Sequence, residues 1–542
     1  NVVGLTLDRQ GANRYNITLR DGASIFNTTT VVLLDGRQIS TIGLQVFDAA
    51  NTNLSGLDLE KIEVVRGSGS SAYGAYTNSG VVHFMSKDPF KFPGTSIEIS
   101  SGGLANQESM LGKGNWDIFQ ASLRHAAAND SGTFGYKINA KYSENGEYEI
   151  DDATVLQTGG QLLEKANGYN VDATLYFRPS SNLEIIAQAG ISAREGLSWS
   201  EFYGEAFENN ENNFFNLKMK SGNLTAQYSA SKNESPFDPA DQGYYYRTTQ
   251  RNTFKNTNDI EESQAQIQYD LTLGTTDVSV GLDHKLSKFN TNWPDGASFE
   301  TQLNGGIFGR NDGSEIRVYG TYFQTNTSIS ENVNLILGGR YDQYANINEG
   351  AFAPKASLIF KPSATSSIRL TASQATTSSN AQAMFQDHLG LSWGLPNQIM
   401  GNATQQTFNN PYVTWAIPGI DQIAAANPVF YQGLGMDLFS IYLGLLPQMI
   451  PALSQSVVGL FVNVPAFLTN PIVWNQVVAN SFIIPVDLVG NNTNLEPSDT
   501  ASIGTETTYE IGYKVQSDKF KASIDIYRQT KENFSALEII SP

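Results

Sequence analysis

Cysteine is absent from the 542 residues of this chain. Its absence excludes a disulfide scaffold, a thiolate metal site and a cysteine nucleophile. Histidine is scarce too, and the four that occur lie far apart in sequence: His83, His125, His284 and His388. Such spacing argues against a histidine-rich metal site. We therefore expect neither a bound metal ion nor a cofactor.

Positive charge is the second shortage. Lysine and arginine number 34 against 53 aspartate and glutamate, and the net charge of −19 makes nucleic acid a poor partner. Charged residues of both signs make up only 16%, against about 25% in ordinary soluble proteins. No apolar run reaches the ~18 residues of a membrane helix, yet aromatic residues reach 11%. This profile is typical of a many-stranded β-barrel.

Residues 1–90 differ from the rest of the chain. Their apolar segments are short, and turn dipeptides such as Asp21-Gly22 and Asp35-Gly36 separate them. We predict a small α+β domain here, followed by a second domain over 95–542. The first residues lack a signal peptide and resemble the interior of a domain, so we expect further residues before Asn1.

After Gly94, apolar and polar residues alternate with a period of two in fifteen stretches. In the clearest of them, Leu337 and Tyr341 share one face while Arg340 and Asp342 share the other. Alternation of this kind predicts strands with one apolar face. A soluble β-sandwich gives the same alternation, so the period alone does not separate the two architectures.

The lengths of the connections separate them. Every second link is short, in seven successive pairs: 126–133, 179–182, 221–222, 272–276, 328–331, 362–365 and 516–518. The intervening links are longer, except for the brief 346–352: 102–115, 143–167, 194–213, 231–261, 287–314 and 374–502. Short turns at one end and long loops at the other are typical of an outer-membrane barrel, whose turns lie in the periplasm. We therefore predict a membrane all-β protein, an antiparallel transmembrane β-barrel.

Two features of the barrel region carry further expectations. A bacterial antiparallel barrel needs an even number of strands, so fifteen strands predict a barrel that continues beyond Pro542. The link 374–502 holds a stretch without a charged residue, Leu438 to Val486, and prolines break it into pieces too short to cross a bilayer. We interpret it as a large extracellular loop with its own core. The alternative is a surface for an apolar ligand or a partner protein.

Catalytic motifs are missing from the sequence. We find no G-x-S-x-G elbow, no H-E-x-x-H pair and no P-loop. Residues 67–72 have the G-x-G-x-x-A spacing of a dinucleotide-binding turn, but a β-rich run follows where a helix is required. We therefore expect a protein that is not an enzyme.

Several segments together resemble the TonB-dependent outer-membrane receptors. The most specific ones resemble the plug of that family: Leu57–Gly67, Ser71–Gly74 and Gly80–Lys87. Others are similar to two earlier plug motifs and a late barrel motif, in the right order: Asn16–Gly22, Val31–Gly36, Leu495–Pro497 and Thr508–Lys514. The style of the plug turns is similar to that of receptors from the Bacteroidetes.

The resemblance implies a barrel of about 22 strands, of which this chain holds about fifteen, with the plug folded inside the lumen. It implies active transport of a scarce or bulky ligand across the bacterial outer membrane, driven by the TonB–ExbB–ExbD complex. The cargo stays open between a metal chelate, a glycan, a peptide and an apolar nutrient. The alternative is a barrel component of a cell-surface complex, in which loop 374–502 docks a surface lipoprotein or another partner.

The family places ligand recognition on outward-facing plug loops. Here the corresponding candidates are Phe26, Asn27, Arg37, Gln38, Phe47, Tyr73 and Tyr76. Amphipathic aromatics with a few amides suit a binding pocket. The alternative for Phe26 and Phe47 is that they only pack the plug.

The resemblance also matches Glu510 to a barrel glutamate that holds plug arginines. The parity of strand 509–514 turns Glu510 toward the lumen, where an unpaired carboxylate is costly. Arg20 and Arg66 are the expected partners, because a guanidinium binds a carboxylate through two donors. We predict that the three form a plug–barrel lock. The alternative is that the arginines pair within the plug, with Glu60 or Glu63.

Overall fold

The computed structural model of the protein describes part of the chain. The described residues are 2–9, 15–20, 30–45, 47, 52–67, 73–109, 112–146, 165–200, 204–234, 258–291, 314–381, 388–392, 395–400, 503–517 and 520–533. No helix among them is long and apolar enough to cross a membrane.

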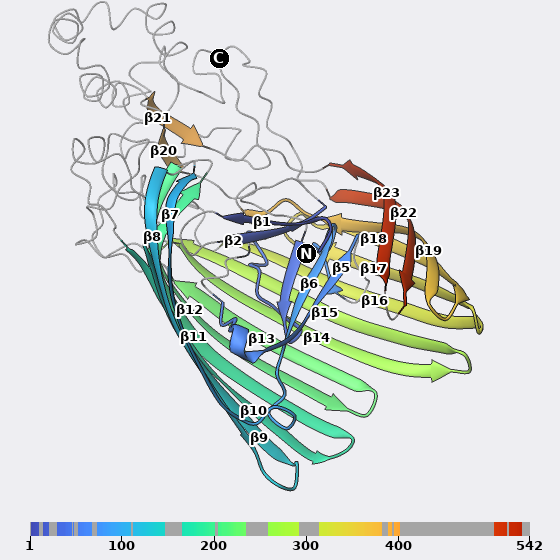
Figure 1. Ribbon diagram of the computed structural model, residues 1–542. Coiled ribbons are helices and arrows are strands. Elements are labelled where there is room, and N and C mark those ends of the chain that lie inside the picture. Colours follow the sequence, from blue (N-terminus) through green and yellow to red (C-terminus); the bar gives the residue numbers. More distant parts are fainter. Residues whose placement is uncertain are drawn as a thin grey trace, which may run out of the picture.

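One antiparallel sheet forms the wall (Figure 1), and it has the fifteen strands that the periodicity predicts. Each strand pairs with the next one along the chain, and β19 pairs with β22. The wall strands are β7 (Gly94–Ser109), β8 (Gly112–Ala128), β9 (Phe134–Gly146), β10 (Lys165–Ser180), β11 (Leu183–Ser200), β12 (Gly204–Ser221), β13 (Leu224–Glu234), β14 (Asn258–Leu273), β15 (Thr276–Thr291), β16 (Ser314–Ser330), β17 (Val333–Tyr344), β18 (Glu349–Ser363), β19 (Ser366–Thr377), β22 (Gly504–Gln516) and β23 (Lys521–Glu532). In the part of the chain described, β7 and β23 are the edges of this sheet. That the barrel continues beyond residue 542 stays a prediction.

The two faces of the wall follow the predicted alternation. Leu337 and Tyr341 are exposed on the outer face of β17, whereas Arg340 and Asp342 are buried on the inner face. Apolar side chains are exposed on the outer face of most wall strands, for example Ile97 at 70% and Ile526 at 64%. An outer face of this composition suits lipid, and a polar inner face suits a water-filled or plugged lumen.

The seven short links are confirmed, and they lie at one end of the wall. Two-residue turns join β10 to β11 and β12 to β13. Two of the predicted long links are wrong, because β7 and β8 extend into 102–115 and β11 and β12 extend into 194–213. Beyond the bilayer, outward residues no longer need to be apolar. The strands therefore continue there without the alternation that marks them within the membrane.

The described residues before β7 make up a smaller domain, the predicted plug, which lies on the concave side of the wall (Figure 1). A hairpin of β1 (Leu5–Arg9) and β2 (Tyr15–Leu19) precedes a four-stranded sheet. Its strands are β3 (Thr30–Leu34), β4 (Arg37–Gln38), β5 (Leu59–Arg66) and β6 (Gly80–Ser86), in the order β4-β3-β6-β5. The 3-10 turn η2 (Gly56–Asp58) precedes β5. The described part of the plug has no α-helix, so the expected α+β character is reduced there to strands and short turns.

The parallel pair β3 and β6 is buried on both faces, which explains its continuous apolar sequence. One face packs within the plug, in a cluster of Ile17, Leu19, Val32, Leu34, Phe47, Val82 and Phe84. The other face packs against the wall, in a cluster that includes Val31, Leu33, Tyr76, Val81, Phe289, Ile316, Val318 and Tyr344. The hydrophobic effect therefore holds the plug together and also holds it to the barrel.

The predicted loop 374–502 is described only in part. Two short strands within it, β20 (His388–Ser392) and β21 (Leu395–Met400), pair with each other. The uncharged stretch 438–486 lies outside the described residues.

Candidate functional site

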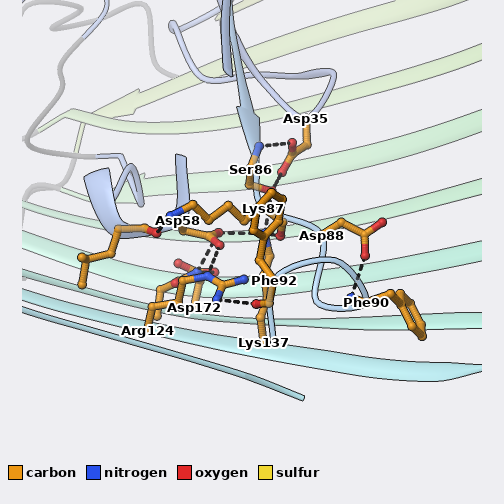
Figure 2. A network of polar contacts seen from close by, with 12 residues as sticks. Asp35, Asp58, Ser86, Lys87, Asp88, Phe90, Phe92, Arg124, Lys137 and Asp172 are labelled. Carbon is orange, nitrogen blue, oxygen red and sulfur yellow. Dashed lines mark hydrogen bonds and ion pairs between the residues drawn. The ribbon is translucent and has the colours of Figure 1, made fainter. Parts of the chain in front are cut away.

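Asp58 lies at the centre of a buried polar network between plug and wall (Figure 2). Its carboxylate accepts hydrogen bonds from Arg124 Nε of β8 at 2.7 Å, and from Lys137 Nζ and Asn139 Nδ2 of β9 at 2.7 and 3.2 Å. The three charged side chains are at most 8% exposed. A buried charge is costly unless it is paired, so this cluster fixes η2 against the wall.

The same network holds the end of β6 and the linker into the barrel. Lys137 Nζ also donates to Ser86 Oγ at 2.5 Å and to the Lys87 carbonyl at 3.2 Å. Ser86 Oγ in turn donates to Asp35 Oδ2 at 2.5 Å (Figure 2). We call Asp35, Asp58, Ser86, Arg124 and Lys137 the Asp58 anchor. It joins the C-terminal half of the plug to β8 and β9.

A second ionic contact ties the N-terminal half of the plug to the last strands of the wall. Arg20, directly after β2, places Nη1 2.5 Å from Glu510 Oε2 on β22. Its guanidinium also lies over the Tyr527 ring of β23, 4.1 Å from the centroid. Glu510 faces the lumen, while its neighbours Tyr509 and Ile511 are exposed on the outer face. Both ionic side chains are buried, at 2% and 4% exposure.

Arg66 lies beside this pair but contacts a different carboxylate. Its Nη2 atom is 2.7 Å from Asp525 Oδ2 on β23. Arg369 of β19 forms an ion pair with Glu510 and lies 3.6 Å from Asp525 Oδ1. Three guanidinium groups therefore share two carboxylates. We call Arg20, Arg66, Arg369, Glu510 and Asp525 the Glu510 cluster.

Two local features of the plug make room for this cluster. Arg20 adopts a left-handed backbone with φ of 55°, which is unusual for a non-glycine residue. Gly67 has φ of 89°, and a Cβ there would lie 3.2 Å from Arg20 Nη1. The glycine after Arg66 thus gives both the turn and the space for Arg20 to reach Glu510. The alternative pairing within the plug is not seen in the described residues, where Glu63 pairs with Lys61.

Nearer the long-loop end, the wall binds backbone groups of the plug. Glu262 Oε1 of β14 accepts the N–H groups of Ile42 and Gly43, at 2.6 and 3.3 Å. Lys285 Nζ of β15 donates to Gln38 Oε1 at 2.8 Å and to the Ala75 carbonyl at 3.2 Å. Sequence reasoning missed these wall residues, although charged side chains on the inner parity of β14 and β15 were a signal for them.

The predicted ligand residues are placed in different surroundings. Phe47 packs inside the plug, and Tyr76 is 1% exposed, with its hydroxyl 3.1 Å from Ser378 Oγ. Tyr76 also has φ of 72°, a strained conformation for a bulky residue, which the surrounding wall holds in place. The Phe47 ring packs against the plug and the Tyr76 ring packs between plug and wall. Contact of either ring with a ligand stays a prediction. Phe26 and Asn27 lie outside the described residues.

Three other predicted ligand residues face the wall or a cavity next to it: Arg37, Gln38 and Tyr73. Arg37 is buried over the Phe214 ring, 3.9 Å from its centroid, and burial lowers the pKa of its guanidinium to about 10. Tyr73 lines a cavity between plug and wall, and burial raises the pKa of its phenol. No group of three His, Cys, Asp or Glu side chains in the described ranges is arranged to hold a metal ion.

Comparison with known protein families accounts for this arrangement. The family model for the TonB-dependent receptor plug domain matches residues 1–81. The family model for the TonB-dependent receptor-like β-barrel matches residues 187–416, so the two together cover more than half of the chain. The chain belongs to the TonB-dependent receptors. The expected Bacteroidetes origin stays a prediction.

Solved structures of receptors share the fold at low sequence identity. The siderophore receptor PirA from Acinetobacter baumannii is 13% identical with a TM-score of 0.58, over 98% of this chain and 67% of that one. The ferric enterobactin receptor PfeA from Pseudomonas aeruginosa, in complex with BCV-L6, is 16% identical with a TM-score of 0.56, over 98% and 68%. The copper transporter OprC is 10% identical with a TM-score of 0.55, over 97% and 67%. No curated protein matches the chain.

As a TonB-dependent receptor, the protein is an outer-membrane β-barrel that transports its ligand past a plug. Its family consists of transporters. The Asp58 anchor and the Glu510 cluster are then the groups that hold the plug of this receptor in place.

His83 gives the plug of this receptor a pH dependence. Its Nε2 accepts the Gly36 N–H at 3.0 Å, so the ring is neutral. Burial lowers the pKa of His83 below 6.5, a shift that Lys61 and Lys218 favour and that Asp35 and Glu63 oppose. A histidine with a lowered folded pKa binds its proton more readily in the unfolded state. The contribution of His83 to plug stability should therefore be constant above about pH 6.5 and fall below it, by at most about 1.4 kcal/mol per pH unit.

Urea unfolding of the plug between pH 7.5 and 5.5 measures this effect. The variant His83→Gln keeps an acceptor for Gly36 but does not titrate, so its unfolding midpoint should change less over the same range. An equal pH dependence in the two proteins would contradict the role of His83.

Proposed function

We propose that the protein imports a scarce or bulky ligand through a gate formed by the plug, with energy from the TonB–ExbB–ExbD complex. The observation that supports this most is the pair of buried ionic contacts at the two halves of the plug. One is Asp58 with Arg124 and Lys137, and the other is Arg20 with Glu510. Contacts of this kind hold a closed state and must separate before the lumen opens.

The two contacts are placed to respond differently to a pull on the N-terminal side of the plug. Arg20 follows the first hairpin of the plug, whereas the Asp58 anchor lies next to the linker at residues 87–93. A pull transmitted along the chain from its N-terminal side reaches Arg20 first. The Glu510 cluster is therefore the lock in this proposal, and the Asp58 anchor keeps the rest of the plug attached.

The names of the similar structures support a scarce or bulky cargo. Their names describe a siderophore receptor, a ferric enterobactin receptor and a copper transporter. A cargo of this kind is too scarce or too large for diffusion through a porin. We propose that Tyr73, Arg37 and Gln38, with Phe26 and Asn27, contact the ligand once the plug has moved, because in the closed state the first three face the wall or a cavity.

Depletion of solutes from growth medium tests the function while the ligand is still unidentified. Cells with and without the receptor are compared by mass spectrometry of the medium. At least one solute should be depleted only by cells that carry the receptor, and a proton uncoupler should stop its depletion. Equal depletion by both cell types, or depletion that the uncoupler leaves unchanged, would overturn the proposal.

A further inference from the structure

A cavity of about 800 Å³ lies between the plug and the wall. The plug contributes β5 residues and Tyr73 and His83, and the wall contributes residues of β12–β14, β16–β19 and β22. Several lining residues, such as Lys220 and Arg369, lie close to the short turns at Ser221 and Ser366. The cavity therefore occupies the half of the lumen that faces the periplasm.

Its charge is opposite to that of the whole protein. A single carboxylate, that of Glu510, lines the cavity. Five cationic side chains line it as well: Arg66, Lys218, Lys220, Lys355 and Arg369. The two arginines are compensated, because Arg66 pairs with Asp525 and Arg369 pairs with Glu510. The three lysines form no ion pair with a described residue, although Glu184 is the register partner of Lys220 and Glu510 acts on Lys355 from a distance. This is unusual in a chain with 53 acidic and 34 basic residues.

The three lysine ammonium groups have no hydrogen bond or ion pair with any described residue. Lys218 and Lys220 project from one face of β12, two positions apart, and Lys355 projects from β18. Other inward lysines are used differently: Lys137 binds Asp58, and Lys285 binds Gln38. Unpaired cations that converge on one space create a positive potential, which attracts anions.

Neutral donors surround these lysines. The lining includes five glutamines from β13, β14 and β16: Gln227, Gln264, Gln266, Gln268 and Gln324. Gln227, Gln266 and Gln268 already donate to protein oxygens. The amides of Gln264 and Gln324 can still donate to an oxygen of a ligand, without adding to the positive charge. Together, unpaired cations and amides suit a ligand with several charged oxygen atoms.

We propose that this cavity binds an organic anion with two or more negative charges, held by Lys218, Lys220 and Lys355. Its position on the transport path rests on the proposed function, but its affinity for an anion does not. A carboxylate, phosphate or other oxyanion group on the cargo would meet these lysines after leaving the outward side of the plug.

These 542 residues contain no cysteine, so a single thiol introduced among them can report the potential in the cavity once any cysteine elsewhere in the receptor has been replaced by serine. Thr225 lines the cavity and pairs with Lys220 in the sheet, so Thr225→Cys places a thiol beside the lysines. In the purified full-length receptor, its rates of reaction with an anionic and a cationic methanethiosulfonate reagent are compared. The quantity compared is the rate with the anionic reagent divided by the rate with the cationic reagent. We expect this ratio to be about tenfold higher for the thiol in the cavity than for a free thiol, since nearby charges act strongly at short range.

Charge-neutral variants provide the matched control. Lys220→Gln alone should reduce the ratio, and Lys218→Gln, Lys220→Gln and Lys355→Gln together should return it to the free-thiol value. Lys220 is exposed in the lumen, so its single replacement leaves the fold intact and keeps the test decisive if the triple variant folds poorly. A ratio at the free-thiol value in the parent Thr225→Cys protein would overturn the proposal.

Protection of the same thiol tests binding. Millimolar citrate should slow modification of Thr225→Cys by an uncharged maleimide, whereas sucrose should not. No protection by citrate would reject the anion site even if the potential is positive. These measurements involve no transport, so a failure of receptor-dependent uptake in cells would contradict the proposed function and leave the anion site standing.

Discussion

Asp58→Asn is expected to lower the free energy of plug unfolding by about 3–5 kcal/mol, because it leaves two buried cations without their carboxylate. Arg124 and Lys137 are 3% and 0% exposed, so solvent offers them little compensation. Urea titration of the full receptor measures the change, with hydrogen exchange of the β6 amides as the signal for plug unfolding. For a domain of this size the midpoint should fall by on the order of 2 M.

Asp88→Asn is the matched control for this change. Asp88 pairs with Arg178, also between linker and wall, but the two side chains are 20% and 29% exposed. A partly exposed pair contributes up to about 1 kcal/mol, so the midpoint should hardly move. Equal effects of the two substitutions would contradict the role of the Asp58 anchor.

Glu510→Gln is expected to release the N-terminal half of the plug while leaving the rest folded. The glutamine keeps the shape of the side chain but removes the charge from a buried ion pair. Breaking such a pair costs up to about 3–5 kcal/mol, and the polar amide that remains beside Arg20 reduces this cost. A loss of about 2 kcal/mol raises the population of the released state by about 30-fold. Hydrogen exchange of the β2 amides, Tyr15–Leu19, should accelerate by the same factor. Ligand binding should be nearly unchanged, whereas transport should change.

Asp270→Asn is the control for Glu510→Gln, because it also removes a carboxylate that faces the lumen but one that does not contact the plug. Asp270 lies on β14 and accepts hydrogen bonds from Gln268 and Ser279, which belong to the wall. This variant should leave β2 exchange unchanged. If Glu510→Gln and Asp270→Asn behave alike, the Glu510 cluster is not a lock.

Strand periodicity and turn length were sufficient to predict the wall of this receptor. The alternation at Leu337, Arg340, Tyr341 and Asp342 predicted both faces of β17, because lipid and lumen impose opposite polarity on neighbouring residues. The same reasoning missed the long-loop ends of β7, β8, β11 and β12. There the chain leaves the bilayer, and the demand for apolar outward residues ends.

The ionic contacts of the plug were harder to predict. Asp58 and Lys137 lie 79 positions apart in sequence, and no local spacing relates them. Family resemblance brought Arg20 and Glu510 together but left Arg66 with the wrong partner, since Asp525 on the neighbouring strand is nearer to it. A choice between two carboxylates on paired strands depends on side-chain reach, which sequence does not contain.

Labelling of a buried plug residue in living cells tests the gate most directly. Ser79 is 0% exposed, and Ser79→Cys in this cysteine-free chain should react with a membrane-impermeant maleimide only when the plug moves. Glu349→Cys, exposed at the start of β18 at the long-loop end, reports reagent access in the same cells. The account predicts rapid labelling of Ser79→Cys in energised cells that receive the ligand, and only background labelling after a proton uncoupler, with Glu349→Cys labelled equally in both. Labelling of Ser79→Cys that is independent of the proton gradient would contradict it.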